Sequence, residues 1–575
     1  MRWITNRYII SVDASIPVDD DGGSEGQEPP NKKQKLSGAQ RKQLAKDEKM
    51  KKRGSNKNRR FGKVTEDVEL CWKLASGLPC EFGDECRFTH DIKTYLKTKS
   101  RDIKLPPSSA LSAEAPFVIP PNISPIDPEF SSVDFTTTCP VFESTGVCNV
   151  GLKCRFLGGH ASRVDFGIGI GLIKDEEREE ELRDSFIERN FLKSETAKTI
   201  RNKTYPTLVA TEYLEALKLK EAKNNGSQEK DDFVPTMEFD GSQLDSPDAI
   251  LRPNEKKRLD WRGKTCTRLC VKLGADITCG EMGLANSFLS ASKEEWSLVR
   301  RHPSEKIFGI QLAGSKPATL VTTAEIMAKE FGRDLDFVDL NCGCPIDLVF
   351  KTGAGSALLD QTGKLGKILI GMNRALGEIP LTLKIRTGVK DGKNTAHKLM
   401  PRIGQEWGAS AITIHGRSRQ QRYTRLADWD YIKQCVETLR EASQDDDLPT
   451  IPIFGGGDCY SSESYWSAVE NTGVDGVMVA RGALIKPWIF TEIKERREWD
   501  ISSRERLDFI REYATFGLDH FGSDTAGVNK TRRYLCEALS FQYRYIPIGL
   551  LERLPGKINE RPPLFRGRDE LGKWA

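Results

Sequence analysis

Seven short apolar segments recur between residues 275 and 482, and they constrain the fold of this 575-residue chain more than any other feature. Several are rich in valine and isoleucine and end at a glycine or a polar residue, and stretches of helical pattern separate them. This rhythm predicts parallel strands joined by helices. The segments are ADITCGEM (275–282), IFGIQLAG (307–314), DFVDLNCG (336–343), LTLKIRTG (381–388), SAITIHGR (410–417), IPIFGGGD (451–458) and GVMVARG (476–482).

The segments predict an α/β barrel of the TIM type over residues 252–500. A closed barrel of this type has eight strands and about 250 residues, so the sequence supplies one strand too few. Residues 501–575 have a helical pattern followed by a proline-rich tail, which predicts a helical C-terminal domain.

The part of the chain before the barrel is polar. Residues 1–64 include a basic run from Asn31 to Arg60 and too little apolar surface to offset the entropy lost on ordering, which predicts a disordered tail. It is either a solubilising tail or an arm for nuclear localisation or nucleic-acid binding. Residues 164–251 are expected to be a helical and polar linker, with a charged helical segment over 174–200.

Composition excludes some classes of protein. The chain has no run of roughly 18 consecutive apolar residues, as an integral membrane protein would need. The N-terminus lacks a signal-peptide core, so a secreted protein is not expected. The 14 cysteines are then expected to be thiols or metal ligands and not a disulfide framework. The formal charge of +4 indicates no particular partner.

Six of the cysteines form two triplets, and a histidine closes each triplet. The spacings are C-x8-C-x5-C-x3-H and C-x8-C-x5-C-x5-H, and the repeated gaps make coincidence improbable. Three thiolates and one imidazole complete a tetrahedral zinc shell, which predicts two structural zinc fingers over residues 65–163. Aromatic and basic residues around the ligands favour contact with single-stranded RNA over contact with another protein or with the barrel. The predicted ligands are Cys71, Cys80, Cys86 and His90, and Cys139, Cys148, Cys154 and His160.

The segment DFVDLNCGCP places a reactive thiol just past a predicted strand, where βα barrels keep their catalytic groups. A cysteine with an unperturbed pKa of roughly 8.5 is mostly a thiol at neutral pH and can donate a proton. Taken alone, the pair Cys342 and Cys344 would equally suit redox chemistry, a metal or buried sulfur.

Other polar groups lie near the ends of later predicted strands. They are Gln311, Lys384 and His415, each of which alone would suit an ordinary structural role. Glycine-rich turns follow the last two strands, at the place where barrels bind phosphate through backbone amides. Together these features predict a phosphorylated cofactor such as FMN.

Motifs along the chain resemble those of the tRNA-dihydrouridine synthases, and the twin fingers resemble the eukaryotic branch that acts at uridine 47. These motifs are GADITCGEM, FGIQLAG, DFVDLNCGCPIDLV, LTLKIRTGV, IHGRSRQQRYTRLADW, GVMVARGALIKPWIF and GLLERLPGKINERPP. The resemblance implies an FMN-bearing barrel, a helical RNA-binding domain, and NADPH as reductant.

The resemblance also implies roles for individual residues. Cys344 would be the acid that protonates uracil C5, and Cys342 would have no assigned role. Arg417, Arg419 and Tyr423 are candidate RNA contacts. The implied FMN contacts are Gln311, Lys384, His415, Gly456, Gly457, Asp458, Ala480 and Arg481, although relatives often have asparagine at the position of Gly456.

The implied partner is tRNA, with mRNA left open, and no membrane. A monomer in the cytoplasm and nucleus is expected.

The chain departs from the family pattern after Lys264. A strand and loop of about fifteen residues, corresponding to the first of the eight barrel strands, are absent, and TCTRLCVKLGADI follows at once with the pattern of the next helix. Either RLDWRGKTC (258–266) serves as a poor first strand, or the sequence reflects a faulty or alternatively spliced gene model, which we favour. The missing strand favours one alternative function, an RNA-binding zinc-finger protein with an inactive barrel. A second alternative, a flavin oxidoreductase of small molecules, shares the barrel but does not explain the fingers.

Overall fold

The computed structural model describes residues 64–105, 130–164, 169–186, 188–225, 268–445 and 450–548. The chain divides into two compact units. The larger unit comprises residues 175–516 and 534–562, and the smaller unit, here called the finger unit, comprises residues 1–174, 517–533 and 563–575. Almost all of the predicted disordered tail and the segment 226–251 lie outside the described residues.

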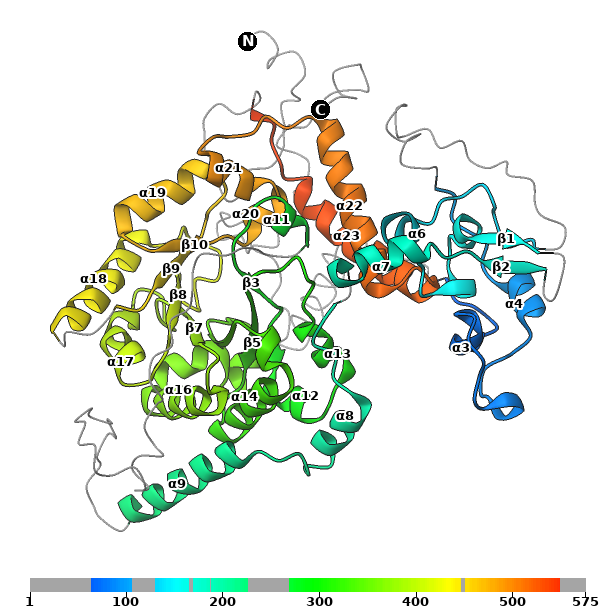
Figure 1. Cartoon of the computed structure of the whole chain (residues 1–575). Helices are drawn as coiled ribbons and strands as arrows, with labels where there is room; N and C mark the ends of the chain where they lie inside the picture. The colour runs from blue at the N-terminus through cyan, green and yellow to red at the C-terminus, as the bar shows by residue number, and fades with distance from the viewer. Residues whose placement is uncertain are drawn as a thin grey trace, which may run out of the picture. The chain divides into compact units, whose positions relative to one another are not determined.

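A curled, parallel β-sheet forms the centre of the larger unit (Figure 1). All seven predicted strand segments form strands of this sheet, and the prediction of parallel pairing is confirmed. The strands are β3 (Thr278–Cys279), β4 (Gly283–Leu284), β5 (Phe308–Ala313), β6 (Phe337–Cys342), β7 (Leu381–Arg386), β8 (Ala411–His415), β9 (Ile453–Gly456) and β10 (Gly476–Met478).

The first predicted segment divides into two short strands. Both pair with β5 at different levels, since Thr278 lies opposite Phe308 and Gly283 lies opposite Leu312. The main path of the sheet therefore runs β10-β9-β8-β7-β6-β5-β3. Among the described residues, β10 and β3 do not pair, so the sheet is open there.

The proposed gap falls in a part of the chain that the structure does not describe. Residues 258–266, which include RLDWRGKTC, fall outside the described residues, so the missing first strand stays a prediction. The stretch after it is helical as expected, with α11 at Arg268–Lys272. Leu269 and Leu273 of this stretch pack with Trp488 and Tyr545 in a small core.

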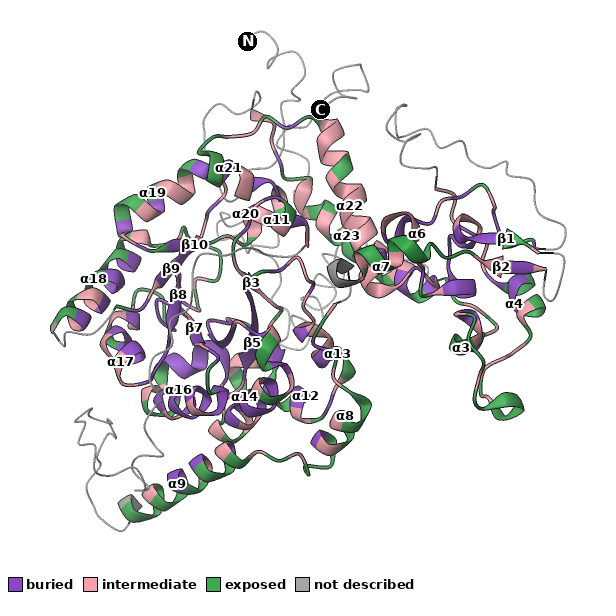
Figure 2. Ribbon diagram, in the orientation of Figure 1, coloured by how far each residue is buried: buried purple, intermediate pink, exposed green. Residues whose placement is uncertain are grey.

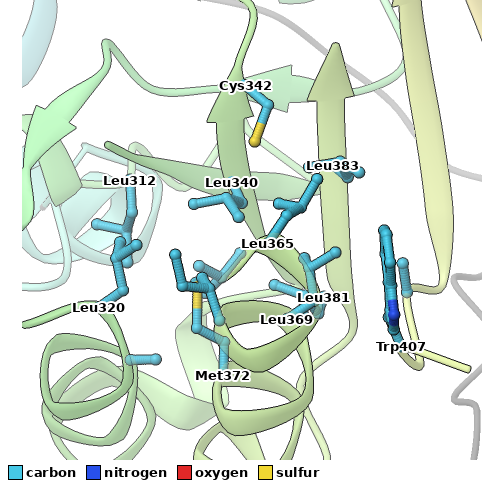
Figure 3. Close-up of a cluster of buried hydrophobic side chains, with 14 of the residues drawn as sticks. Leu312, Leu320, Leu340, Cys342, Leu365, Leu369, Met372, Leu381, Leu383 and Trp407 are labelled. Carbon is cyan, nitrogen blue, oxygen red and sulfur yellow. The ribbon is translucent and has the colours of Figure 1, made fainter. Parts of the chain in front are cut away.

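Helices cover the outer face of the sheet and bury a large apolar core, seen as purple ribbon in Figure 2. In β6, the alternate residues Val338, Leu340 and Cys342 belong to this core. Figure 3 shows Cys342 among the leucines of the neighbouring strands, above Leu365 and Met372 of the helix layer. The helices of this layer are α12 (Ala285–Leu289), α13 (Lys293–Trp296), α14 (Pro317–Phe331), α16 (Thr362–Leu376), α17 (Met400–Gln405), α18 (Trp429–Asp445), α19 (Ser462–Thr472) and α21 (Ile489–Glu495).

The charged segment 174–200 is helical, as the sequence predicts, and it forms two helices, α7 (Glu176–Phe186) and α8 (Ser194–Arg201). Asn190 interrupts the segment with φ of 66° and donates its side-chain amide to the carbonyl of Val299, so a tertiary contact overrides the helical pattern. The next helix, α9 (Leu208–Asn225), packs on α14 and α16 through Tyr213 and Leu217.

Two helices make up most of residues 501–548, as the sequence predicts, with α22 at Ser503–Phe521 and α23 at Thr525–Gln542. The first part of α22 belongs to the larger unit, where Arg268 stacks on the ring of Phe516 and Trp488 stacks on Phe509. No helix in the described part of the chain has both the length and the apolar character needed to cross a membrane.

The finger unit has one shared core and not two separate ones. Tyr95 and Leu96 near the first cysteine cluster, Phe130 and Leu157 near the second, and Leu518 from α22 all belong to it. Its elements are α3 (Trp72–Ala75), α4 (Ile92–Thr98), α6 (Pro140–Thr145), β1 (Ala161–Arg163) and β2 (Ile170–Leu172). The two clusters and residues 517–533 are therefore parts of one folded body.

Candidate active site and metal centres

Alternation along β6 divides its residues between the two faces of the sheet. Cys342 and Leu340 point into the core beneath the helices, so Asp339 and Asn341 point to the inner face. Register places Gln311, Asp339 and Thr382 opposite one another on three neighbouring strands. The inner face of an otherwise apolar sheet thus carries a row of polar side chains.

These side chains form one hydrogen-bonded network. The amide of Gln311 donates to Asp339 at 2.7 Å, and the hydroxyl of Thr382 donates to the other carboxylate oxygen at 2.7 Å. Asn341 donates to the amide oxygen of Gln311 at 2.7 Å. Burial raises the pKa of Asp339, while the two donors and the charge of Lys384 oppose that shift.

The loop after β6 holds Cys344 over this network. The backbone N–H groups of Gly343 and Cys344 donate to Asn341 Oδ1 at 3.1 and 2.9 Å, and Ser356 Oγ donates to the carbonyl of Cys344 at 2.8 Å. Gly355, at φ of 60°, allows this approach, because a Cβ there would lie 3.1 Å from the Cβ of Cys344. Cys344 is buried, with 9% of the residue's surface exposed, so the thiol sits in a fixed loop beside the inner face.

Cys342 occupies a different environment from its neighbour. Its side chain is fully buried in the outer-face core, and burial raises the pKa of its thiol well above the usual range. A thiol in that position packs as a small apolar group. The structure thereby separates the two cysteines, with Cys344 alone near the polar inner face.

Positive charge gathers at the carboxyl ends of β7 and β8. Lys384 and Arg386 come from β7, and His415 from β8 lies opposite Arg386 in register. Burial, reinforced by the charge of Arg386, lowers the pKa of Lys384. The ammonium group of Lys384 makes no hydrogen bond or ion pair with the described residues, whereas the guanidinium of Arg386 donates to the carbonyls of Gly343 and Ser418 at 2.7 and 3.1 Å.

His415 should make the folded protein sensitive to acid. Burial and the charges of Arg386 and Lys384 lower its pKa to about 2, so the imidazole stays neutral in the folded state, while the unfolded chain takes up a proton below a pH of about 6.5. Stability should then fall below that pH by up to about 1.4 kcal/mol per pH unit. Urea titrations of the larger unit should show that His415→Gln loses about 2 kcal/mol less than the wild type between pH 7 and pH 5. Equal losses in the two proteins would contradict this account.

The turns after β9 and β10 meet at Asp458. Its carboxylate accepts hydrogen bonds from the guanidinium groups of Arg417 and Arg481 and from the backbone N–H of Ala427. Gly457 has φ of 134°, and a Cβ there would lie 2.5 Å from Ala427. Gly456 ends β9, and Ala480 and Arg481 open the short helix α20 (Arg481–Ile485). The structure therefore brings these glycine-rich turns together around two arginines.

The loop after β8 covers this cationic region. The ring of Tyr423 lies 4.4 Å from the guanidinium of Arg481 and edge-on to His415, with ring centroids 6.3 Å apart. Arg419 pairs with Asp347 of α15 (Asp347–Lys351) at 2.6 Å. The loop is thus tied to the helix that follows Cys344.

Both predicted metal-ligand sets assemble in the finger unit. In each set, the four ligand atoms lie within 4.8 Å of one another. Cys139 Sγ and Cys154 Sγ are 3.9 Å apart, close to the edge of about 3.8 Å for a tetrahedron with Zn–S bonds of about 2.3 Å. Within the described part of the chain, His90 Nε2 and His160 Nε2 are buried and lack hydrogen-bond partners, which suits coordination of a metal.

The two clusters differ in burial. All four ligands of the second cluster are buried, whereas only Cys71 of the first cluster is buried. Ser523, from the segment between α22 and α23, lies with its Oγ 3.2 Å from Cys148 Sγ, and its carbonyl accepts the backbone N–H of Arg155 at 2.8 Å. The C-terminal segment thus supplies a polar neighbour to the second cluster.

Comparison of the sequence with those of known proteins identifies its family. The model of the family described as "Dihydrouridine synthase (Dus)" matches residues 258–539, and that of the "DUS3L CCCH zinc finger domain" matches residues 67–98. A protein of Coprinopsis cinerea named tRNA-dihydrouridine(47) synthase is 57% identical over 92% of this chain and 86% of its own length. The chain belongs to the dihydrouridine synthase family. This result confirms the family, the enzyme class and the α/β fold that the motifs predict.

Other dihydrouridine synthases match over similar lengths. A Cryptococcus neoformans protein with the same name is 46% identical over 90% of this chain and 82% of its own length. A human protein named tRNA-dihydrouridine(47) synthase-like is 41% identical over 90% of this chain and 78% of its own length.

Sequence reasoning did not single out several groups at these sites. Asp339 and Thr382 sit inside apolar strands, and the carboxylate of Asp339 in such a strand is the sequence feature that could have identified it. Arg386 follows Lys384 by two residues and therefore shares its face. Ser523 had no local signal, because its partner Cys148 is 375 residues away in the chain.

Proposed function

We propose that this dihydrouridine synthase reduces a uridine of tRNA, at position 47, to 5,6-dihydrouridine, with FMN as cofactor and NADPH as reductant. One observation supports the proposal above the others. A nearly buried thiol, Cys344, is held beside a polar inner face whose rim carries Lys384, His415 and two arginines. The relatives' names supply the substrate and its position.

The residues of the inner face suit a bound FMN. His415 Nδ1 and Arg417 Nη1 are buried without partners among the described residues, so a further polar group can be accommodated there. Lys384 and Gln311 would contact the ring system, and the turns at Gly456, Gly457, Asp458, Ala480 and Arg481 would surround the phosphate, where the cationic rim matches its charge.

A bound FMN, once reduced by NADPH, would supply the hydride that adds to C6 of the uracil. Cys344 would donate the proton to C5, and its thiolate would then recover a proton from solvent. Asn341 holds the backbone of the Cys344 loop through two N–H groups. The uracil has to leave its stack to reach the inner face, and Arg419 and Tyr423 are placed on the loop that would meet the RNA.

The first finger offers a surface for RNA. Phe82 and Trp72 have 70% and 46% of their surfaces exposed, and Lys73 and Arg87 lie in the same short segment. Exposed aromatic rings among cations suit stacking with unpaired bases. The proposal also includes zinc at both clusters, a monomeric state, residence in cytoplasm and nucleus, and mRNA as a further substrate.

The test uses purified full-length protein, NADPH and an unmodified tRNA transcript. The protein should carry FMN, and mass spectrometry of nuclease fragments should find dihydrouridine at position 47. A transcript with cytidine at that position should gain none. Dihydrouridine at another position would contradict the site of action, and colourless protein without activity would contradict the proposed catalysis.

The alternative is an RNA-binding finger protein with an inactive barrel, and the proposed gap after Lys264 is the feature that favours it. Removing one strand from a barrel creates two unpaired edges. If the gap is real, this chain should hold well under one FMN, and inserting about fifteen residues with the family's strand-and-loop pattern should restore binding. Full FMN occupancy in the 575-residue chain would reject the gap hypothesis.

A further inference from the structure

Asp339 lies at one end of a chain of hydrogen bonds that reaches the Cys344 loop. It is 4% exposed and sits in the middle of β6, with Gln311 and Thr382 as its donors. Asn341 links Gln311 to the backbone N–H groups of Gly343 and Cys344. Four side chains therefore connect the middle of the sheet with the loop that carries the thiol.

The loop end of this chain is chemically unambiguous, because backbone N–H groups can only donate. Asn341 must turn its oxygen to the Cys344 loop and its amide nitrogen to Gln311. Gln311 must then accept with its oxygen and donate to Asp339, which leaves its second N–H free to point elsewhere on the inner face.

We propose, on the basis of the function above, that Asp339 is a positioning residue for the reaction. It fixes the orientation of the Gln311 amide, and through Asn341 it holds the backbone of the Cys344 loop. Without an acceptor at position 339, the Gln311 amide could rotate, and Asn341 would lose the partner that holds its nitrogen. Substitution of Asp339 would then shift the thiol of Cys344, although Asp339 contacts neither the thiol nor the substrate.

The experiment compares two variants of the full-length, FMN-loaded protein. Asp339→Asn keeps an oxygen for Gln311, because its new amide can donate to the hydroxyl of Thr382, so kcat should stay within about 3-fold of the wild type. Asp339→Val removes the acceptor but is similar in size and suits a strand. Its kcat should fall about 10²-fold, as displacements of about 1 Å can do, with KM for tRNA nearly unchanged.

Two further readouts do not need turnover. The alkylation rate of Cys344, followed on its peptide by mass spectrometry, and the visible spectrum of bound FMN should change in Asp339→Val and not in Asp339→Asn. Asp336→Asn is the matched control, because Asp336 lies directly before the same strand and binds Arg301 and the N–H of Phe308. Its kcat and alkylation rate should match the wild type.

Three outcomes would overturn the proposal. The first is an Asp339→Val variant with the wild-type kcat and alkylation rate. The second is an Asp339→Asn variant as impaired as Asp339→Val, because that result would assign the effect to the negative charge of Asp339 and not to its acceptor oxygen. If melting curves show that Asp339→Val does not fold, Asp339→Ser replaces it, because the serine hydroxyl is too short to reach Gln311. The third outcome that would reject the proposal is an Asp339→Ser variant with the wild-type kcat and alkylation rate. A wild-type protein without dihydrouridine activity would reject the proposed function, and the alkylation rates would still test Asp339.

Discussion

Replacing Cys344 with alanine should remove most dihydrouridine formation while the protein still folds and still binds FMN. A positioned general acid commonly contributes about 10²–10⁴-fold to a rate, and no other thiol of the described residues shares the Cys344 loop. Its sulfur makes no hydrogen bond within the described residues, so alanine leaves the loop held by Asn341 and Ser356. Single-turnover reduction of tRNA by the reduced protein should measure the loss directly.

Cys342→Ala is the matched control, and its effects should be the reverse. Cys342 is fully buried among Leu340 and Leu383, so the smaller side chain leaves a cavity and costs about 1 kcal/mol of stability or somewhat more. The rate of tRNA reduction should stay within a few-fold of the wild type. Loss of activity in Cys342→Ala, with activity retained in Cys344→Ala, would reverse the assignment of the acid.

Removing a ligand of the second metal cluster should unfold the whole finger unit. Cys154→Ser replaces a fully buried ligand whose backbone carbonyl also accepts a hydrogen bond from Lys99 at 2.6 Å. Zinc binding in small fingers is worth about 10–16 kcal/mol, which exceeds the total stability of most domains. Zinc content should fall below one per chain, tRNA affinity should drop, and the melting transition of the finger unit should disappear.

Cys80→Ser provides the comparison within the same unit. Cys80 is partly exposed in the first cluster, beyond the shared core, so its loss should release about one zinc of about two. The second cluster and the core around Leu157 should persist. FMN content should be unchanged in both variants, and loss of FMN in Cys80→Ser would show that the finger supports the barrel and not RNA binding.

The fold of the barrel could be predicted well because its signals are local. Each strand combines apolar residues with a terminal glycine or polar group, and all seven segments pair in chain order. The metal ligands were equally accessible, since fixed spacing identifies them and the structure brings both sets together. The separation of Cys342 from Cys344 also follows from alternation along one strand.

The features that sequence reasoning missed depend on contacts between distant segments. Asp339 gains its place from Gln311 and Thr382, which lie on the two neighbouring strands, and no local pattern reports that pairing. The break at Asn190 depends on Val299, 109 residues later. The shared core of the finger unit requires Leu518, which carries no motif.

The late arrival of Ser523 and Leu518 has a consequence for synthesis on the ribosome. Cys148 and Ser523 are separated by 375 residues, and Glu66 and Thr525, joined by a hydrogen bond, are separated by 459. At about 5–20 residues per second, translation takes about 20–75 s to pass from Cys148 to Ser523. Throughout that interval the nascent fingers lack part of their core, and early capture of zinc by the cysteines is the interaction that can hold them folded until the C-terminal helices emerge. Zinc measured on ribosome-bound chains stalled before residue 517 would test this order of events.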